Sequence, residues 1–436
     1  MFWIELITIM LMIFWGAKKG GIFLALSGGI GMVILTFIFN VKPSDPPITV
    51  MLIILAVIIA AGAMETAGGL DFMVQVAEKI LRKNPKHITI VAPIVAYIFT
   101  FLCGTGHIIY SLLPVMNEIA LDNGIRPERP ISASIVSSQQ AITACPISAA
   151  TAALIGFLAV YHNVNLTTIL IICLPATLIG TIAGALSVYK RGKELADDPE
   201  YQKRVSQGLV KDYKVQGEVK SITKGAKLSV AIFLVFMLAI VVMGAFSNLR
   251  PVFADKSSLA MTSIIQILML AAGAFIVILC KLDSNKIIHT SIFKSGMFAL
   301  VLAFGLCWLV NTFIGDQTSF ISSSMSALTN KYSWMFIIGV FIVGAITTSQ
   351  AATTMIMIPI AIALHIPLYV IIAGWIACSS NYFIPDAGQC VAALAFDTAG
   401  TTKIGKYVLN HSYMRPGLVT TVVSVLVALG IGYVVL

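Results

Sequence analysis

Apolar runs of roughly 16–22 residues recur from one end of the chain to the other, separated by short charged segments. An α-helix needs about 20 apolar residues to cross the hydrocarbon core of a bilayer, so this pattern predicts an all-α polytopic membrane protein. The expected spans are 1–16, 20–40, 48–64, 88–121, 130–161, 165–189, 228–248, 259–280, 295–314, 335–365, 367–396 and 417–436.

Two of these runs, 88–121 and 335–365, are too long for a single crossing, and polar or glycine residues interrupt each near its middle, at 104–106 and 347–350. Each arm has about 15 residues, or roughly 22 Å of helix, against a hydrocarbon core of roughly 30 Å. We therefore expect two re-entrant helical hairpins, whose arms enter the membrane and return to the same side.

Two further spans, 130–161 and 367–396, carry a proline inside an apolar helix, at Pro146 and Pro385. Proline lacks a backbone N–H and interrupts the helical hydrogen-bond ladder. These spans are expected to be broken transmembrane helices, each following one of the hairpins.

The same order of elements occurs twice, in a first half (1–189) and a second half (228–436). In each half, a hairpin is followed by a broken helix and a final span. The hairpin tips lie ten residues before a proline: Gly104 before Pro114, and Ser349 before Pro359. The two hairpins open to opposite sides, which predicts an inverted-topology repeat of the kind found in secondary transporters.

Positive charge is distributed unevenly between the two sides of this topology. Loops on one side carry 24 of the 28 Lys and Arg residues, and those on the other carry 4. Cytoplasmic loops of membrane proteins are enriched in Lys and Arg. The basic side is therefore expected to be cytoplasmic, with both termini on the opposite side of the membrane. The same rule accounts for the net charge of +9 without nucleic-acid binding.

The hydrophilic segment 190–227 separates the halves and is expected to be a solvated cytoplasmic linker, since it mixes ten basic with six acidic residues. The whole chain is 58% apolar and only 11% charged. No metal constellation, nucleophile–base pair or cofactor loop is recognisable, so neither an enzyme nor a bound cofactor is expected. The seven scattered cysteines are expected to be buried apolar residues.

Polar residues cluster at the predicted helix breaks, where transporters of this architecture bind their substrates. No Arg or Lys lies inside a predicted span, so hydroxyls, amides and helix N-termini would have to hold an anion. Two such clusters related by a two-fold axis suit a dicarboxylate, although a single anion or a cation is also compatible. The candidate substrate-binding residues are Thr105, Gly106, His107, Ser138, Gln139, Gln140, Thr143, Ser349, Gln350, Thr353, Ser380 and Asn381.

Several candidates have a second interpretation. His107 can bind a carboxylate, carry a proton or simply cap a helix. Asp386, directly after Pro385, is the expected cation- or proton-coupling residue, with a helix N-cap as the alternative. The hydroxyls of Thr143 and Thr353 can instead bond to their own helix backbone.

Motifs along the whole chain resemble the anaerobic C4-dicarboxylate transporter (Dcu) family, most closely its fumarate/succinate branch. They are AKKGG (17–21), AGGLDFMVQVAEKILRKNPKHITIVAPIV (67–95), CGTGHIIYSLLPV (103–115), NGIRPERP (123–130), TSQAA (348–352) and FDTAGTTKIGKYVLNH (396–411). The resemblance implies an exchanger of the bacterial inner membrane, with both termini periplasmic, that imports fumarate, malate or aspartate and exports succinate during anaerobic respiration. A more distant similarity to sodium-coupled divalent-anion symporters implies a homodimer that works by an elevator motion.

Two departures separate the chain from these patterns. The hairpin tips lack the Ser-Asn-Thr triad of the sodium-coupled symporters, and DAGQCVAAL follows Pro385 where the family has a Thr-Tyr-Pro-like stretch. Coupling therefore stays open between exchange and a proton- or sodium-coupled symport. A third alternative is a membrane sensor or co-regulator of C4-dicarboxylate signalling, whose cytoplasmic loops contact a sensor kinase.

Overall fold

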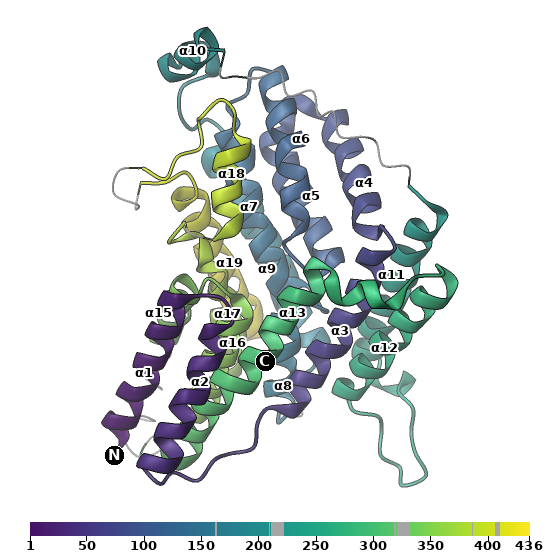
Figure 1. Cartoon of the computed structure of the whole chain (residues 1–436), viewed down its shortest axis with the longest axis vertical. Helices are drawn as coiled ribbons and strands as arrows, with labels where there is room; N and C mark the ends of the chain where they lie inside the picture. Colours follow the sequence, from purple (N-terminus) through teal and green to yellow (C-terminus); the bar gives the residue numbers. More distant parts are fainter. Residues whose placement is uncertain are drawn as a thin grey trace.

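The computed structural model describes residues 1–436 except 162–163, 209, 211–221, 318–319, 321–331, 386 and 406–409. Regular structure within the described part is helical, and eight of its helices are long and apolar enough to cross a membrane. The predicted all-α, multi-pass architecture is thus confirmed. Most helices run roughly along the long axis of the molecule, with α10 at one end and the N-terminus towards the other (Figure 1).

Helices of the first half follow the expected order. They are α1 (Phe2–Lys19), α2 (Phe23–Val33, continued by a π-helix over Ile34–Ile38), α3 (Ile48–Thr66), α4 (Gly69–Lys83), α5 (Ile88–Cys103), α6 (Ile108–Asp122), α7 (Glu128–Ala144), α8 (Ala149–Leu158) and α9 (Leu166–Val188). The connecting segment contains α10 (Pro199–Ser206).

Helices of the second half are α11 (Lys224–Ala245), α12 (Met261–Leu279), α13 (Ser291–Leu302, continued by a π-helix over Ala303–Cys307), α15 (Met335–Thr347), α16 (Gln350–Ala363), α17 (Leu368–Trp375, continued by a 3-10 helix over Ile376–Tyr382), α18 (Gly388–Phe396) and α19 (Met414–Val435). Helices α1–α3 and α11–α13 pack together through close crossings at small residues. A Cβ atom on Gly28 would lie 2.4 Å from the backbone of Gly305.

In each of the two helix pairs that we interpret from the sequence as hairpins, the chain turns at a residue in the left-handed backbone conformation. Gly104 has φ +71° and closes α5, with its N–H bonded to Thr100 O at 2.9 Å. Thr348 has φ +50° and closes α15 through the carbonyl of Gly344 at 3.0 Å. After Thr348, the extended Ser349 caps the N-terminus of α16 by accepting a hydrogen bond from the Ala352 N–H.

The two broken helices are interrupted where the prolines predict. Helix α7 ends at Ala144, and α8 starts after Ser148, whose hydroxyl accepts from the Thr151 N–H at 3.1 Å. In the second half, the 3-10 segment after α17 ends at Tyr382 and α18 begins at Gly388. These breaks leave backbone donors and acceptors outside any helix in the middle of otherwise apolar segments.

The last helices of the two halves, α9 and α19, run side by side in the centre of the molecule and are in unusually close contact (Figure 1). A Cβ atom on Gly180 would lie 1.9 Å from Ser424 Oγ, and one on Gly184 would lie 1.9 Å from Thr420 Oγ1. Small residues spaced four apart allow two helix backbones to approach closely. In a membrane, where the hydrophobic effect does not drive helices together, this close packing stabilises their association.

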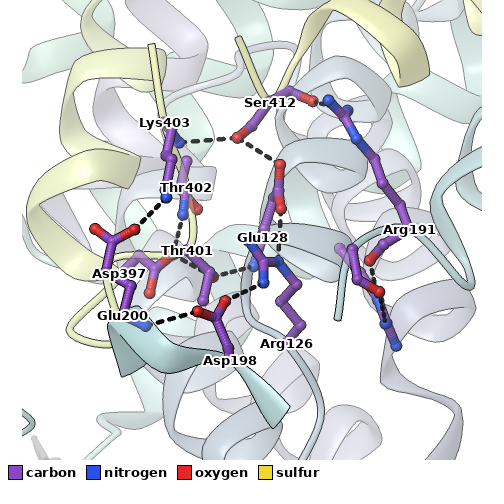
Figure 2. Close-up of polar contacts among 12 residues, drawn as sticks. Arg126, Glu128, Arg191, Asp198, Glu200, Asp397, Thr401, Thr402, Lys403 and Ser412 are labelled. Atoms are coloured by element: carbon purple, nitrogen blue, oxygen red, sulfur yellow. Dashed lines mark hydrogen bonds and ion pairs between the residues drawn. The ribbon is translucent and has the colours of Figure 1, made fainter. Parts of the chain in front are cut away.

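A polar cluster, hereafter the clasp, joins the connecting segment to the basic end of α7 (Figure 2). Arg126 lies between two carboxylates, with Nε 2.7 Å from Glu128 Oε2 and Nη1 2.5 Å from Asp198 Oδ2. Arg129 pairs with Glu194 at 2.9 Å. The side chains of Arg126, Glu128 and Asp198 are all buried.

The clasp also holds the loop between α18 and α19. Ser412 donates to Glu128 at 2.7 Å, and the Glu128 N–H donates to Thr401 Oγ1 at 3.0 Å (Figure 2). Asp397 caps this loop by accepting from the Thr401 hydroxyl and the Thr402 N–H. Side chains of the connecting segment, such as Glu194 and Asp198, thus bond to α7 and to Arg126 just before it, although most of residues 191–206 are exposed. The solvated cytoplasmic linker expected over 190–227 stays a prediction.

We expect Gly184→Leu to destabilise the protein by at least 1–3 kcal/mol, because the added side chain has no space beside Thr420. The melting temperature of the purified protein in detergent measures this effect. Gly430→Leu on α19 is the matched control, since a Cβ there meets no atom within 4 Å. Equal melting temperatures for the two variants would contradict the close α9–α19 packing.

We expect Asp198→Ala to lower stability by up to roughly 3 kcal/mol, because Arg126 loses one of two buried partners. Burial raises the pKa of the Asp198 carboxyl, but hydrogen bonds from Arg126 and the Glu200 N–H outweigh it, so the pKa lies below its usual range. The difference from the wild type should thus persist down to about pH 4 and shrink as the pH falls further. Asp197→Ala, an exposed neighbour, should melt like the wild type.

Candidate functional site

A cavity of about 320 Å³ lies where the two helix tips and the two broken helices meet α3 and α13. Residues from both halves of the chain therefore contribute to one site. Its walls are polar on the side of the tips and breaks and mostly apolar on the side of α3 and α13. The apolar wall comprises Val57, Ile58, Ala61, Ile292, Gly296, Phe298 and Ala299.

Seven of the twelve candidate substrate-binding residues line this cavity, and they come from four separate segments. The first tip contributes residues 104–107, and the second contributes residues 348–351. The broken helices contribute the rest. The seven are Thr105, Gly106, His107, Gln139, Ser349, Gln350 and Asn381.

The other five candidates do not line the cavity, and four of them form hydrogen bonds within the surrounding helices instead. Ser138 and Thr100 share a hydrogen bond of 2.8 Å, and the Ser380 hydroxyl donates to Phe341 O at 2.6 Å. Thr143 and Thr353 donate to carbonyls of their own helix turns, at Gln140 and Ser349. Such local bonds are the alternative the sequence left open for these threonines.

Gln140, the fifth of these, is fully buried, and its amide has no hydrogen-bond partner among the described residues. Its side chain is buried within the protein rather than exposed on the cavity wall. Asp386, the coupling candidate, lies outside the described residues.

A chain of amide hydrogen bonds connects the four segments. Gln350 Nε2 donates to Gln139 O at 2.7 Å and to Ser379 Oγ at 3.2 Å. Asn381 Nδ2 donates to Gln139 Oε1 at 2.8 Å. Gln139 Nε2 in turn donates to Gln389 Oε1, and Gln389 Nε2 donates to the Gly106 carbonyl at 3.1 Å.

The Gly106 carbonyl sets the direction of this chain, because a carbonyl can only accept. Gln389 must therefore present Nε2 to it and Oε1 to Gln139, which fixes the Gln139 amide in turn. Asn381 then has to donate, and its Oδ1 atom is left without a partner among the described residues. Gln350 Oε1 is left in the same state, because its Nε2 is held by a main-chain carbonyl.

A side chain at Gly106 would displace the amides that bond to the first tip. A Cβ atom there would lie 2.7 Å from Gln389 Nε2 and 3.0 Å from Gln139 Nε2. The absence of a side chain lets the backbone of the first tip reach the amides of both broken helices.

Three residues of the cavity wall with polar side chains were not among the sequence-based candidates: Ser295, Thr348 and Gln389. Gln389 lies in the DAGQC stretch, which departs from the family pattern. Thr348 stands within the polar run at the second tip, and only the backbone shows that it, rather than Thr347, faces the cavity.

A second cavity, of about 330 Å³, adjoins the first at His107. The carboxylates of Glu65 and Asp71 line it, together with Ser111 and Ser291. Glu65 also caps the start of α13, because its oxygens accept from the N–H groups of Ser291 at 3.1 Å and of Ile292. His107 is half-buried, stacks on Tyr110 at a ring distance of 6.1 Å and is common to both cavities.

Neither cavity has a Lys or Arg among the described residues that line it. Positive potential in the first cavity comes instead from the N-terminus of α16 and from amide N–H groups. Within the described residues, no group of three His, Cys, Asp or Glu side chains is placed to hold a metal ion. The chemistry available is reversible binding of a small polar solute.

Comparison with known proteins gives a consistent result over the full length of the chain. The family model of the anaerobic C4-dicarboxylate membrane transporters matches residues 1–436. The anaerobic C4-dicarboxylate transporter DcuB of Escherichia coli O6:H1 is 40% identical over 433 residues, covering 97% of each chain. The C4-dicarboxylate transporter DcuA of Wolinella succinogenes is 38% identical over 422 residues, covering 97% of this chain and 96% of that protein.

The C4-dicarboxylate transporter DcuA of Escherichia coli K12 is 37% identical over 424 residues, again covering 97% of each chain. These relatives are transporters and not enzymes, in agreement with the absence of recognisable catalytic residues in the sequence. The helical architecture, the full-length match and the identity to both named proteins show that this chain belongs to the DcuA/DcuB family of anaerobic C4-dicarboxylate membrane transporters.

Proposed function

We propose that this protein exchanges C4-dicarboxylates across the bacterial inner membrane by alternating access, taking up fumarate, malate or aspartate and releasing succinate. The observation that carries the proposal is the single cavity shared by both tips and both broken helices. A C4-dicarboxylate has one carboxylate at each end. The two tips supply one set of polar groups for each carboxylate.

The proposed substrate is held without a buried guanidinium or ammonium group. The first-turn N–H groups of α16, capped by Ser349, face one carboxylate with the positive end of the helix dipole. The backbone of residues 105–107 and the Gln389 amide serve the other carboxylate. Helix dipoles and amides carry no net charge, so the loaded site has only the charge of the substrate. Without a buried cation to hold it, the substrate can be released as well as captured.

Alternating access needs a moving unit and a fixed one. We place α5–α9 and α15–α19 in the moving unit, since the α9–α19 contact and the clasp connect its parts. Helices α1–α3 and α11–α13 form the fixed scaffold. In this proposal the two halves, 1–189 and 228–436, are an inverted repeat, the hairpins are re-entrant, and the motion is of the elevator type in a homodimer with both termini periplasmic.

A second candidate function, proton-coupled symport of the same substrates, is favoured by the position of His107. This imidazole borders both the substrate cavity and the cavity that carries Glu65 and Asp71. A histidine there can exchange a proton with the acidic cavity and deliver it to the substrate site. Exchange and symport differ in whether uptake needs substrate on the far side.

We expect purified protein in liposomes to take up radiolabelled fumarate several-fold faster when the lumen contains succinate than when it is empty. Uptake that ignores internal succinate would overturn exchange. Stimulation of uptake into empty liposomes by an inward proton gradient would instead establish the symport. His107→Gln should remove that stimulation, whereas Ser111→Ala, at the same cavity, should retain it.

We expect Gln389→Ala to weaken fumarate binding roughly tenfold, because the amide chain loses its bond to the first tip and a buried donor on Gln139 is left unpaired. Calorimetric titration of the detergent-solubilised protein measures this change. Gln207→Ala, an exposed residue after α10, is the control and should bind as the wild type does. Unchanged affinity in the Gln389 variant would remove the amide chain from the binding site.

A further inference from the structure

The second tip adopts a backbone conformation that disfavours the residue it contains. Thr348 has φ +50° and ψ +18°, in the left-handed region. A β-branched residue is rarely found there, because its Cβ substituents crowd the backbone. At the matching place in the first tip stands Gly104, with φ +71°, which adopts this conformation without such a penalty.

The left-handed turn itself is required by the fold. It ends α15 by a hydrogen bond from the Thr348 N–H to Gly344 O at 3.0 Å. It also places Ser349 in the extended conformation, with φ −135°, from which its hydroxyl caps α16. Glycine at 348 would make the same turn with less strain, so the geometry of the backbone does not explain the threonine.

The Thr348 hydroxyl does not brace the tip through any hydrogen bond within the described residues. The side chain is half-buried on the wall of the 320 Å³ cavity. The preceding Thr347 is different, because it is buried and shares a hydrogen bond of 2.9 Å with Thr353. The two neighbouring threonines thus divide into one that braces the tip and one that faces the cavity.

Backbone strain is kept where the surrounding structure enforces it, and it concentrates at ligand-binding sites. We infer that Thr348 is a substrate-binding residue whose hydroxyl donates to a carboxylate of the ligand, and that the tip retains a strained turn to hold this hydroxyl in the cavity. The inference rests on the proposed dicarboxylate site. It adds Thr348 to the residues that determine substrate affinity. It also predicts that a substitution which relieves the strain at this position raises stability and weakens binding.

The test compares three substitutions at one position. Thr348→Gly removes both the strain and the hydroxyl, Thr348→Val keeps β-branching without the hydroxyl, and Thr348→Ser keeps the hydroxyl. Each protein is purified in detergent, its melting temperature is measured without ligand, and fumarate binding is measured by calorimetric titration.

We expect Thr348→Gly to melt roughly 1–4 °C higher than the wild type and to bind fumarate roughly tenfold more weakly. Thr348→Val should bind as weakly as the glycine variant without the gain in melting temperature. Thr348→Ser should bind within about twofold of the wild type. Fumarate binding by Thr348→Gly or Thr348→Val at wild-type affinity would overturn the role of the hydroxyl.

His365 provides a matched control for the strain. It also has a left-handed backbone, with φ +52°, but it is exposed after α16 and does not line the cavity. His365→Gly should raise the melting temperature and leave fumarate affinity unchanged. A lower melting temperature for Thr348→Gly, beside a higher one for His365→Gly, would overturn the claim of strain at the tip.

These outcomes separate the inference from the proposed function. A wild-type protein that binds no fumarate, succinate, malate or aspartate would overturn the proposed function. A wild type that binds fumarate, with Thr348 variants that bind it equally well, would leave the function intact and overturn only the role of Thr348.

Discussion

Backbone N–H and C=O groups cannot be left unpaired in hydrocarbon, and this constraint determines where the chain can interrupt its helices. The interruptions at residues 104–107, 145–148 and 348–349, and the one between Tyr382 and Gly388, are tolerable because the segments that carry them contribute residues to one cavity inside the protein. The amide side chains of Gln139, Gln350, Asn381 and Gln389 take up part of the bonding capacity that the missing helical turns release. A polar cavity is the consequence of bringing four such breaks together.

The direction of the amide chain follows from one backbone atom, the Gly106 carbonyl. Every amide beyond it must present its donor toward Gly106 and its acceptor away. This ordered arrangement ends at Asn381, whose Oδ1 has no partner among the described residues. A second carbonyl, Gln139 O, orients Gln350 and leaves its Oε1 in the same state. A change in the position of either tip would break some of these hydrogen bonds and form others. The free energy of the amide chain would therefore differ between the states of the proposed alternating access.

Hydropathy predicted the helices, and polar or glycine residues at 104–106 and 347–350, with Pro146 and Pro385, predicted their breaks. Proline alone was not a sufficient signal, because four other prolines stand inside continuous helices: Pro93, Pro114, Pro175 and Pro359. The residues of the cavity wall were predicted less completely. Ser138 and Gln139 are neighbours on one helix, yet only Gln139 faces the cavity, and helical rotation cannot be read from a segment that is buried on every side. Gln389 was missed because its partner, Gly106, is 283 residues away in the sequence.

The contacts of the connecting segment could not be predicted from its composition either. Its composition is that of a solvated segment, but Asp198 is held by Arg126 beside a buried Glu128. A buried cation between two carboxylates is stable only when the geometry of all three is maintained, so the clasp resists any separation of α7 from the loop before α19. In the proposed mechanism, these elements have to move together past α3 and α13. The apolar wall formed by α3 and α13 has few hydrogen bonds to break, whereas the clasp and the amide chain consist of hydrogen bonds and ion pairs. In the proposed mechanism, the moving unit therefore slides along the apolar wall.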